Sequence, residues 1–504
     1  MIAFLQNSDS YNADESKTKG HSEGVFIPEN KDDIKEILKR ARDEKFTLTV
    51  SAKRTGVCGG CVPHGGYVLS TDKMDRIIGI GKKDDHYFVR VEPCVTVNQL
   101  SDALLTKHMD GIENLTENAF EQFKNDPKRY FYPVDPTEMD GSLGGNAATN
   151  ASGPRTLKYG PTRNWICGLG IILSDGTELE IERGRYFAKG RHFDVDINGT
   201  KLDFDIPSYE FNTGVKNAAG VYCKDDMDLI DLFIGSEGLF GIFTYVDVRL
   251  TEWHPLTSNI MFFPDDDSAL SFIREMKTRC NPEFLEYFDC GSIDLVRRSY
   301  SCDPNIPAPP KERCSAVFFD LDDESCYDII SEIAERYGGS LDNSWCSSDR
   351  RDREAMFRFR HSVPQAIFEY VASLKDHMPD IHMMGTDMSV PDDRSDEMMS
   401  YYRKTLDDNS LEYVIFGHMG NNHPHVEIIL KDMDDFRRAK ECYDKFARKA
   451  VELGGSPSAE HGIGKIKNDY IEMMYGTKGK EEIIALKKRL DPYMILNIGN
   501  MVVP

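Results

Sequence analysis

The segment that decides the fold runs GSLGGNAATNASG, from residue 141 to residue 153. Small residues at this density bring the backbone against a flat partner, which is either another segment of the chain or a cofactor ring. A second glycine-rich loop, TGVCGG at 55–60, directly follows the strand-like run TLTV at 47–50, so its backbone N–H groups can approach a phosphate closely. This loop matches neither the nicotinamide pattern GxGxxG nor the nucleotide loop GxxxxGK, and a plain tight turn stays open as the alternative. A third loop, GSEGLFGI at 235–242, is similar in kind.

The composition describes a folded, acidic protein. Its 504 residues correspond to about two to three domains, at roughly 150 residues each. The hydrophobic content of 40% is enough to fill several cores, which excludes global disorder. Lys and Arg number 61 against 85 Asp and Glu, a net charge of −24, and no basic cluster is dense enough to neutralise phosphates. The sequence therefore predicts no nucleic-acid partner.

The sequence contains no recognisable targeting or membrane segment. No stretch approaches the ~20 apolar residues that span a bilayer, and the polar, acidic residues 1–20 do not resemble a secretion signal. We therefore expect a cytoplasmic protein without a transmembrane span, with peripheral membrane association left open. The 12 cysteines of such a chain are expected to be buried thiols rather than disulfides.

Helix and strand patterns alternate along the chain, which indicates an α+β fold. Asn30 is placed to cap a helix whose positions 34, 37, 38 and 41 are apolar and share one face. Asp175-Gly176 separates two apolar runs and predicts a β-hairpin. The segment 185–230 is charged and loop-like, and a second α+β region begins near Trp253.

The segment richest in catalytic residue types is GHMGNNHPHVE at 417–427, with apolar strand-like residues on both sides. A turn in its middle predicts a hairpin that brings His418 and His425 to the same open end, with His423 as a third candidate. A later segment, SAEHGIG, places Glu460 beside His461. Two histidines and one carboxylate form the ligand set of a catalytic zinc-type site, although hydrogen-bonded loop histidines remain the alternative.

The order of these segments resembles the p-cresol methylhydroxylase/vanillyl-alcohol oxidase superfamily of FAD proteins. More narrowly, it resembles the branch of D-lactate dehydrogenase, the glycolate oxidase flavoprotein subunit and D-2-hydroxyglutarate dehydrogenase. The resemblance implies an FAD-binding domain of two α+β subdomains at 1–252, an α+β substrate or cap domain at 253–450, and a segment at 451–504 that completes the active site and returns to the FAD domain. The matching pieces span most of the chain and are 55–63, YPVDP at 132–136, GGNAATN at 144–150, KYG at 158–160, 235–242, and LDP with LNIG at 490–499.

The same resemblance assigns roles to individual residues. His418, His425 and Glu460 fall on the metal ligands, His461 on the catalytic base, and Arg360 on the arginine that binds the substrate carboxylate, although the spacing of Arg360 also suits a solvated helix face. The implied cofactors are FAD and a divalent metal, zinc before iron or manganese. We expect FAD to be non-covalent, because the motif around His64 does not match an attachment site. The residues expected to contact FAD are Lys53, Arg54, Thr55, Gly56, Val57, Cys58, Gly59, Pro133, Asp135, Gly141, Ser142, Gly144, Gly145, Asn146, Ala148, Gly153, Tyr159, Glu237, Gly241, Ile242 and Asn497.

The chain departs from the family pattern at several of these positions. Ala52 and Arg54 replace two glycines of the phosphate loop, so we expect Lys53 or Arg54 to contact the phosphates. Cys58 and Cys61 stand where small residues are usual, and as a C-x-x-C pair they could also be redox-active or bind metal. The remaining departures are Asn421, Asn422 and His423 in place of Asp, Gly and Asn, Ala459 in place of Gly, and Gly385 in place of a lysine of the hydroxyglutarate enzymes.

These residues predict an FAD-dependent oxidation of a D-lactate-like 2-hydroxy acid. The metal would lower the pKa of the substrate hydroxyl, His461 would accept its proton, and the hydride would pass to flavin N5. Oxidation of another alcohol, either a sugar or an aromatic one, is the alternative within enzymes. A silent flavoprotein subunit of a complex is disfavoured by the adjacent Glu460 and His461. Electron-transferring flavoprotein, an iron–sulfur subunit, quinone and oxygen are all open as acceptors, and a homodimer is compatible with the sequence.

Overall fold

The first long helix, α1 (Lys31–Glu44), begins and ends where its sequence directs. The side chain of Asn30 accepts hydrogen bonds from the backbone N–H groups of Asp32 and Asp33, and the helix ends at Lys45 in a left-handed conformation. The four apolar positions predicted to share a face are all buried. The predicted capping and periodicity are therefore confirmed for this helix.

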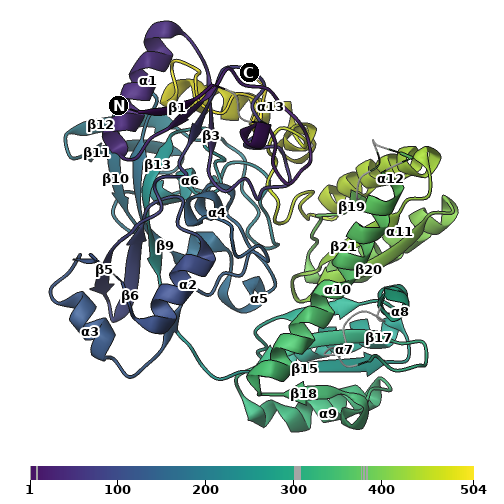
Figure 1. Ribbon diagram of the computed structural model, residues 1–504. Helices are drawn as coiled ribbons and strands as arrows, with labels where there is room; N and C mark the ends of the chain where they lie inside the picture. The colour runs from purple at the N-terminus through teal and green to yellow at the C-terminus, as the bar shows by residue number, and fades with distance from the viewer. Residues whose placement is uncertain are drawn as a thin grey trace.

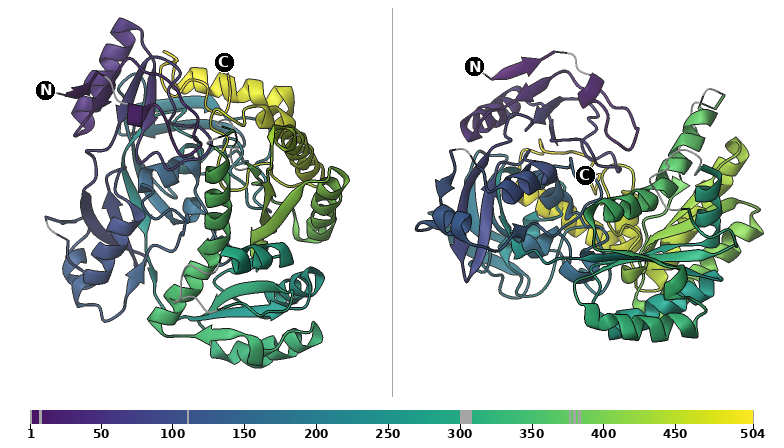
Figure 2. Two further views of the ribbon diagram at one scale, coloured as in Figure 1. Left: turned by 45° about the vertical axis from the view of Figure 1, so that its right-hand side comes forward. Right: turned by 60° about the horizontal axis from the view of Figure 1, so that its bottom comes forward.

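The computed structural model describes residues 2–6, 9–109, 111–299, 308–375, 377–378, 381 and 384–503. The chain forms an N-terminal α+β body, in purple to teal, and a second α+β body, in teal to green, that lies beside it (Figure 1). The yellow C-terminal segment returns to the N-terminal body, and in the right-hand view of Figure 2 it lies between the two bodies. The predicted α+β fold class is confirmed. None of the described helices carries an apolar stretch long enough to cross a bilayer.

A four-stranded sheet starts the N-terminal body, in the order β1-β2-β4-β3. Strands β2, β4 and β3 are parallel, and α1 packs on them through a cluster that includes Leu48 and Leu496. The C-terminal segment joins this sheet beside β3, where the N–H of Leu48 donates to Ile495 O and the N–H of Asn497 donates to Leu48 O. The strands are β1 (Ala3–Leu5), β2 (Val25–Ile27), β3 (Leu48–Ser51) and β4 (Tyr67–Ser70).

A six-stranded sheet completes the N-terminal body, in the order β10-β9-β13-β6-β5-β7. The hairpin predicted at Asp175-Gly176 is present between β9 and β10, which pair antiparallel. The strands are β5 (Ile77–Lys83), β6 (His86–Val91), β7 (Glu113–Asn114), β9 (Ile166–Ile172), β10 (Glu178–Glu182) and β13 (Ile242–Arg249). The helices of this part are α2 (Val97–Thr106), α3 (Ala119–Asn125), α4 (Leu143–Thr149), α5 (Thr156–Tyr159) and α6 (Leu229–Phe233), and β8 (Tyr130–Phe131) pairs with β14 (Thr251–Glu252).

The segment that looked loop-like at 185–230 contains a hairpin, β11 (His192–Ile197) and β12 (Thr200–Asp205). Its charged residues alternate with buried Phe193, Leu202 and Phe204, so one face of the hairpin packs on the body. The expectation of a plain loop was wrong, because the many charged residues masked this period of two.

The second body is built on a seven-stranded antiparallel sheet, in the order β18-β15-β17-β16-β20-β21-β19. Its strands are β15 (Thr257–Phe263), β16 (Leu285–Phe288), β17 (Ser315–Leu321), β18 (Trp345–Ser347), β19 (Met384–Gly385), β20 (Glu412–His418) and β21 (His423–Ile429). Its helices are α7 (Asp266–Arg279), α8 (Cys290–Ser299), α9 (Tyr327–Arg336), α10 (Arg350–Leu374), α11 (Ser395–Asp408) and α12 (Met433–Glu452), and α13 (Asp469–Leu490) leads back to the first body.

Candidate active site

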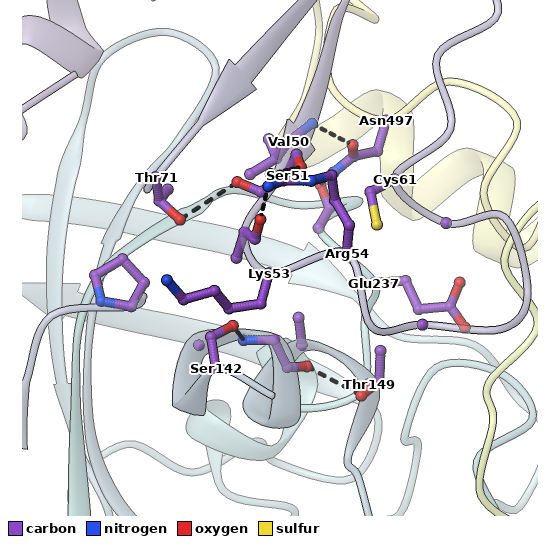
Figure 3. A pocket seen from close by; sticks show the side chains of 18 of the residues that line it. Val50, Ser51, Lys53, Arg54, Cys61, Thr71, Ser142, Thr149, Glu237 and Asn497 are labelled. Atoms are coloured by element: carbon purple, nitrogen blue, oxygen red, sulfur yellow. Dashed lines mark hydrogen bonds between the residues drawn. The ribbon is translucent and has the colours of Figure 1, made fainter. Parts of the chain in front are cut away.

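An elongated cavity opens where the end of β3 faces helix α4 (Figure 3). Its empty volume, which includes space open to solvent, is about 1030 Å³. The loop 51–56, the first turns of α4, the loop around Glu237 and the C-terminal Asn497 form its walls. Four segments far apart in the sequence therefore enclose one cavity.

The two basic side chains of the 51–56 loop have different surroundings. Lys53 extends into the cavity between β3 and α4 (Figure 3). Arg54 adopts a positive φ of 60°, and its guanidinium donates to Ala52 O at 2.6 Å, pairs with Asp72 at 3.3 Å and lies 4.4 Å from the ring of Tyr11. Lys53 is thus the cation of this loop that is available to an anionic group in the cavity.

Small residues form the opposite wall of the cavity. Ser142 caps α4 by accepting a hydrogen bond from Gly145 N at 3.2 Å. A Cβ atom on Gly144 would lie 2.6 Å from Pro93, and one on Gly145 would lie 2.8 Å from Ser142 Oγ. Close packing against Pro93 therefore requires Gly144, whereas a side chain at residue 145 would push aside the Ser142 hydroxyl that caps the helix.

Glu237 and Asn497 connect the cavity wall to distant segments. Glu237 accepts hydrogen bonds from Ile463 N at 2.6 Å and Gly464 N at 2.7 Å, so it anchors the loop that carries His461. Burial raises the pKa of Glu237 to about 7. Asn497 accepts from Val50 N at 2.8 Å and donates to Gly238 O at 3.0 Å.

Most residues expected to contact FAD line this cavity, but seven do not. Tyr159 lies outside it: its hydroxyl donates to Glu283 at 2.9 Å and its ring packs on Phe131 and Trp165. Gly153 serves packing, because a Cβ atom there would lie 1.6 Å from Asp135 O. The residues on the wall are Lys53, Arg54, Thr55, Gly56, Cys58, Ser142, Gly144, Gly145, Asn146, Ala148, Glu237, Gly241, Ile242 and Asn497. Those outside it are Val57, Gly59, Pro133, Asp135, Gly141, Gly153 and Tyr159, of which Val57 lines the neighbouring cavity.

Cys58 and Cys61 are free thiols. Cys58 donates to Gly462 O at 3.4 Å, and Cys61 lies 3.9 Å from Asp14. Burial raises the pKa of each thiol to about 12, so both are protonated near neutral pH. His64 is exposed and does not line the cavity.

The predicted histidine hairpin is present as β20 and β21. His418 lies opposite His423 in the register, and His425 follows two residues later on the same face of β21. The ring centroid of His418 lies 5.4 Å from that of His423 and 5.1 Å from that of His425. With Glu460, these histidines form a group whose ligand atoms all lie within 4.8 Å of one another.

Each histidine of the group faces an oxygen atom on the side away from Glu460. His418 Nδ1 lies 2.5 Å from Glu286 Oε1, and His425 Nδ1 lies 3.3 Å from the Thr386 carbonyl oxygen. His423 Nε2 lies 3.2 Å from Asp387 Oδ1. Such outer contacts fix the ring orientation and tautomer of metal-binding histidines.

His423 is the most informative member of the group. Its side chain is fully buried; its Nε2 faces Asp387 Oδ1, whereas its Nδ1 has no hydrogen-bond partner among the described residues. Its Nδ1 lies 3.9 Å from Glu460 Oε2, and burial lowers its pKa to about 4, so the ring is neutral. A neutral imidazole whose Nδ1 faces a carboxylate without a hydrogen bond fits a metal ligand, and the donor set of three histidines and one glutamate suits zinc or another first-row metal.

Lys216 lies against the same carboxylate. Its ammonium pairs with Glu460 Oε1 and donates to Gly153 O at 3.0 Å, with only 2% of its side chain exposed. Burial alone would raise the pKa of Glu460, but the charges of Lys216 and His418 outweigh it and hold that pKa well below its ordinary value. Glu460 is therefore an ionised carboxylate shared between a lysine and the histidine group.

His461 lies at the junction of two cavities. It lines the cavity beside α4 and a second cavity of about 1300 Å³ that also contains Arg360, His425 and Glu460. Its Nδ1 lies 3.3 Å from Asp387 Oδ2, and about a third of its side chain, 36%, is exposed. Burial by the surrounding protein lowers its pKa, which keeps the ring neutral and able to accept a proton.

Asp387 organises the loop around His461. Its carboxylate accepts hydrogen bonds from Glu460 N at 3.0 Å and His461 N at 3.2 Å, and Lys467 donates to it at 2.8 Å. Burial would raise the pKa of Asp387, but the neighbouring His461 ring and the Lys467 ammonium hold it well below its usual range. The buried carboxylate of Asp387 thus holds the backbone of both Glu460 and His461 in place.

Arg360 is buried on α10 rather than on a solvated helix face. Its Nε donates to Glu286 Oε2 at 3.0 Å, and Nη1 lies 3.0 Å from His361 Nε2. Glu286 therefore connects Arg360 to His418. The sequence prediction did not include Lys216, Glu286 or Asp387, which carry no motif of their own; their only signal was a charged residue within an apolar or small-residue run.

Two family models match the chain. FAD binding domain matches residues 22–120 and 124–182, and FAD linked oxidases, C-terminal domain, matches residues 257–501. Together they cover both α+β bodies.

Named relatives are similar over nearly the whole chain. Glycolate oxidase subunit GlcD of Bacillus subtilis is 26% identical, over 95% of this chain and 88% of its own length. D-2-hydroxyglutarate dehydrogenase of Stutzerimonas stutzeri is 25% identical, over 99% of this chain and 95% of its own length. D-lactate dehydrogenase of Archaeoglobus fulgidus is 23% identical, over 100% of this chain and 97% of its own length. Among solved structures, p-cresol methylhydroxylase with substrate bound superposes with a TM-score of 0.65 at 16% identity, over 99% of this chain and 94% of that one.

Proposed function

We infer that the chain belongs to the FAD-linked oxidases with the p-cresol methylhydroxylase fold, in the branch of the D-lactate, glycolate and D-2-hydroxyglutarate enzymes. On this premise we propose that it oxidises a D-lactate-like 2-hydroxy acid to the 2-oxo acid. The observation that carries the proposal is the position of His461, which lines both the α4 cavity and the cavity of the histidine group. An alcohol bound at that junction could lose its hydroxyl proton to His461 and a hydride to a flavin in the α4 cavity.

FAD in the α4 cavity would supply the two-electron acceptor, and a divalent cation held by His418, His425 and Glu460 would supply positive charge to the substrate hydroxyl. The protein residues position and deprotonate the substrate. Arg360 would bind the substrate carboxylate through its fork of N–H groups. His461 would accept the hydroxyl proton.

Asp387 supports the assignment of His461 as the base. Its carboxylate accepts the backbone N–H of His461 and faces Nδ1 of the ring, which leaves Nε2 to receive the proton. The anion also stabilises the imidazolium that forms when His461 takes up the proton. We assign zinc to the metal site on the donor set, and residues 1–252 and 253–450 to FAD binding and substrate binding.

The test is anaerobic reduction of the bound flavin. D-lactate, glycolate and D-2-hydroxyglutarate are added in turn, and the flavin absorbance is followed before and after removal of metal with a chelator. We expect at least one acid to bleach the flavin, and chelation to abolish the bleaching and added zinc to restore it. His461→Ala should keep its yellow colour and reduce the flavin about 10²–10⁴ times more slowly.

Two outcomes would contradict the proposal. If none of the acids reduces the flavin of a metal-loaded protein, the substrate class is wrong. If the chelated protein and His461→Ala both react at the wild-type rate, the assigned roles of the metal group and of the base are wrong.

A further inference from the structure

Glu427 is a buried carboxyl group that the proposed chemistry does not use. It is 8% exposed, and its Oε2 atom accepts no hydrogen bond from the described residues. No lysine, arginine or histidine nitrogen in the described part of the chain forms an ion pair with it. Burying a polar group without a partner is costly, and such a group marks a place where a ligand can supply the missing contact.

The strand register places Glu427 in the substrate cavity. It follows His425 by two residues on β21, so both side chains point to the same face of the sheet, roughly 7 Å apart along the strand. Both residues line the cavity that also contains Arg360 and His461. A molecule held at His461 by its 2-hydroxyl group can therefore reach Glu427 with its distal end.

Gly385 makes room for the carboxyl group. It lies directly opposite Glu427 in the antiparallel pair of β19 and β21. A Cβ atom on residue 385 would lie 2.0 Å from Glu427 Oε1, so any side chain there would displace the carboxyl group. The missing side chain at 385 and the Glu427 carboxyl group, whose Oε2 has no partner in the part of the chain that the structure describes, are parts of one arrangement.

The structure assigns Glu427 as the residue that recognises the distal end of the substrate, and the group it fits is a hydroxyl. The assignment rests on the proposed function and names its substrate class, a 2-hydroxy acid with a further hydroxyl group near its fourth carbon. A hydroxyl donates to a carboxylate and accepts from a carboxylic acid, so it complements Glu427 in either protonation state. A second carboxylate would instead meet a carboxyl group that forms no ion pair with a cation of the described residues.

The test compares three four-carbon acids that differ only at the distal end: (R)-2-hydroxybutyrate, (R)-2,4-dihydroxybutyrate and (R)-malate. The rate of anaerobic flavin reduction gives kcat/KM for each. We expect the dihydroxy acid to exceed 2-hydroxybutyrate by about tenfold and malate by more, because a site built to hydrogen-bond a hydroxyl rejects analogues that lack it.

Two variants separate recognition from general damage. Glu427→Leu should bring the ratio of dihydroxybutyrate to hydroxybutyrate close to one, whereas Glu427→Gln should keep that ratio and react better with malate. Glu138→Leu is the control, because Glu138 lines the same cavity but is exposed at its edge. It should leave the ratio unchanged.

The outcomes distinguish this inference from the proposed function. If no 2-hydroxy acid reduces the flavin, the proposed function fails. If hydroxybutyrate reacts but the wild type prefers malate or shows no preference for the dihydroxy acid, only the role of Glu427 is refuted. A preference that survives in Glu427→Leu would refute it as well, and if that variant does not fold, the wild-type ratios and Glu427→Gln decide.

Discussion

Replacing Lys216 with methionine tests how the histidine group balances its charge. Lys216 and Glu460 form a buried ion pair, with 2% and 9% of their side chains exposed. Lys216→Met keeps the volume of the side chain but leaves the carboxylate of Glu460 without its cation. We expect opposite effects on the metal-free and metal-loaded proteins.

The magnitude follows from the burial of the pair. Removing one partner of a buried pair costs about 3–5 kcal/mol, so the metal-free variant should be less stable than the wild type by about that amount. A bound divalent cation would no longer be repelled by the ammonium group, and two unit charges 4 Å apart interact by about 4 kcal/mol at an effective dielectric constant of 20. A tenfold gain in zinc affinity corresponds to about 1.4 kcal/mol, which is less than this repulsion energy. We therefore expect Lys216→Met to bind zinc at least tenfold more tightly than the wild type.

The assay combines zinc titration against a chromophoric chelator with thermal unfolding, with and without zinc. Zinc at 100 times its Kd should add about 2.7 kcal/mol of stability. Lys487→Met is the matched control, because Lys487 forms a buried pair with Asp491 at 2.5 Å, apart from the histidine group. It should show the same loss of stability, but no change in zinc affinity.

The reasoning is refuted if Lys216→Met binds zinc more weakly than the wild type. It is also refuted if zinc stabilises Lys216→Met no more than it stabilises Lys487→Met. Either result would mean that Lys216 supports the site by holding its shape and not by balancing its charge.

Three further predictions concern single residues. Because burial raises the pKa of Glu237 to about 7, the folded protein keeps a proton that the unfolded chain releases near pH 4.5. The free energy of unfolding should therefore fall by up to about 3 kcal/mol between pH 4.5 and 7. Thermal unfolding at pH 5 and pH 8 should show this loss of stability in the wild type but not in Glu237→Gln. Cys58 and Cys61 should resist alkylation by iodoacetamide at pH 8 in the folded protein, since burial raises both pKa values to about 12; rapid labelling monitored by mass spectrometry would contradict their burial. His423→Asn should bind zinc at least tenfold more weakly in the chelator titration if His423 is a ligand, and unchanged affinity would remove it from the donor set.

Local signals in the sequence predicted local features well. The cap at Asn30 and the hairpin at Asp175-Gly176 each depend on a few neighbouring residues, and both are present. The histidine hairpin was predictable for the same reason, because two apolar strands around a short turn bring His418 and His425 together. Where charge obscured the alternation, as in the segment 185–230, the same reasoning missed a hairpin.

The glycine-rich segments predicted a cavity but not all of its walls. Gly144 and Gly145 line it, whereas Gly153 packs against Asp135 O and Tyr159 bonds to Glu283. A small residue in a motif signals a close approach of backbone, and the sequence does not say whether the approaching atom belongs to a cofactor or to the chain itself.

By itself, the sequence determined the α+β class, the family resemblance and the placement of His418, His425, Glu460 and His461 in two short motifs. Only the tertiary structure placed Lys216 against Glu460, 244 residues away, and placed Glu427 in the cavity beside His461, where its Oε2 atom has no hydrogen-bond partner among the described residues. The reason is physical. Backbone periodicity and turns are fixed by neighbours in the chain, whereas the charge balance of a buried site is the sum over all segments that fold around it.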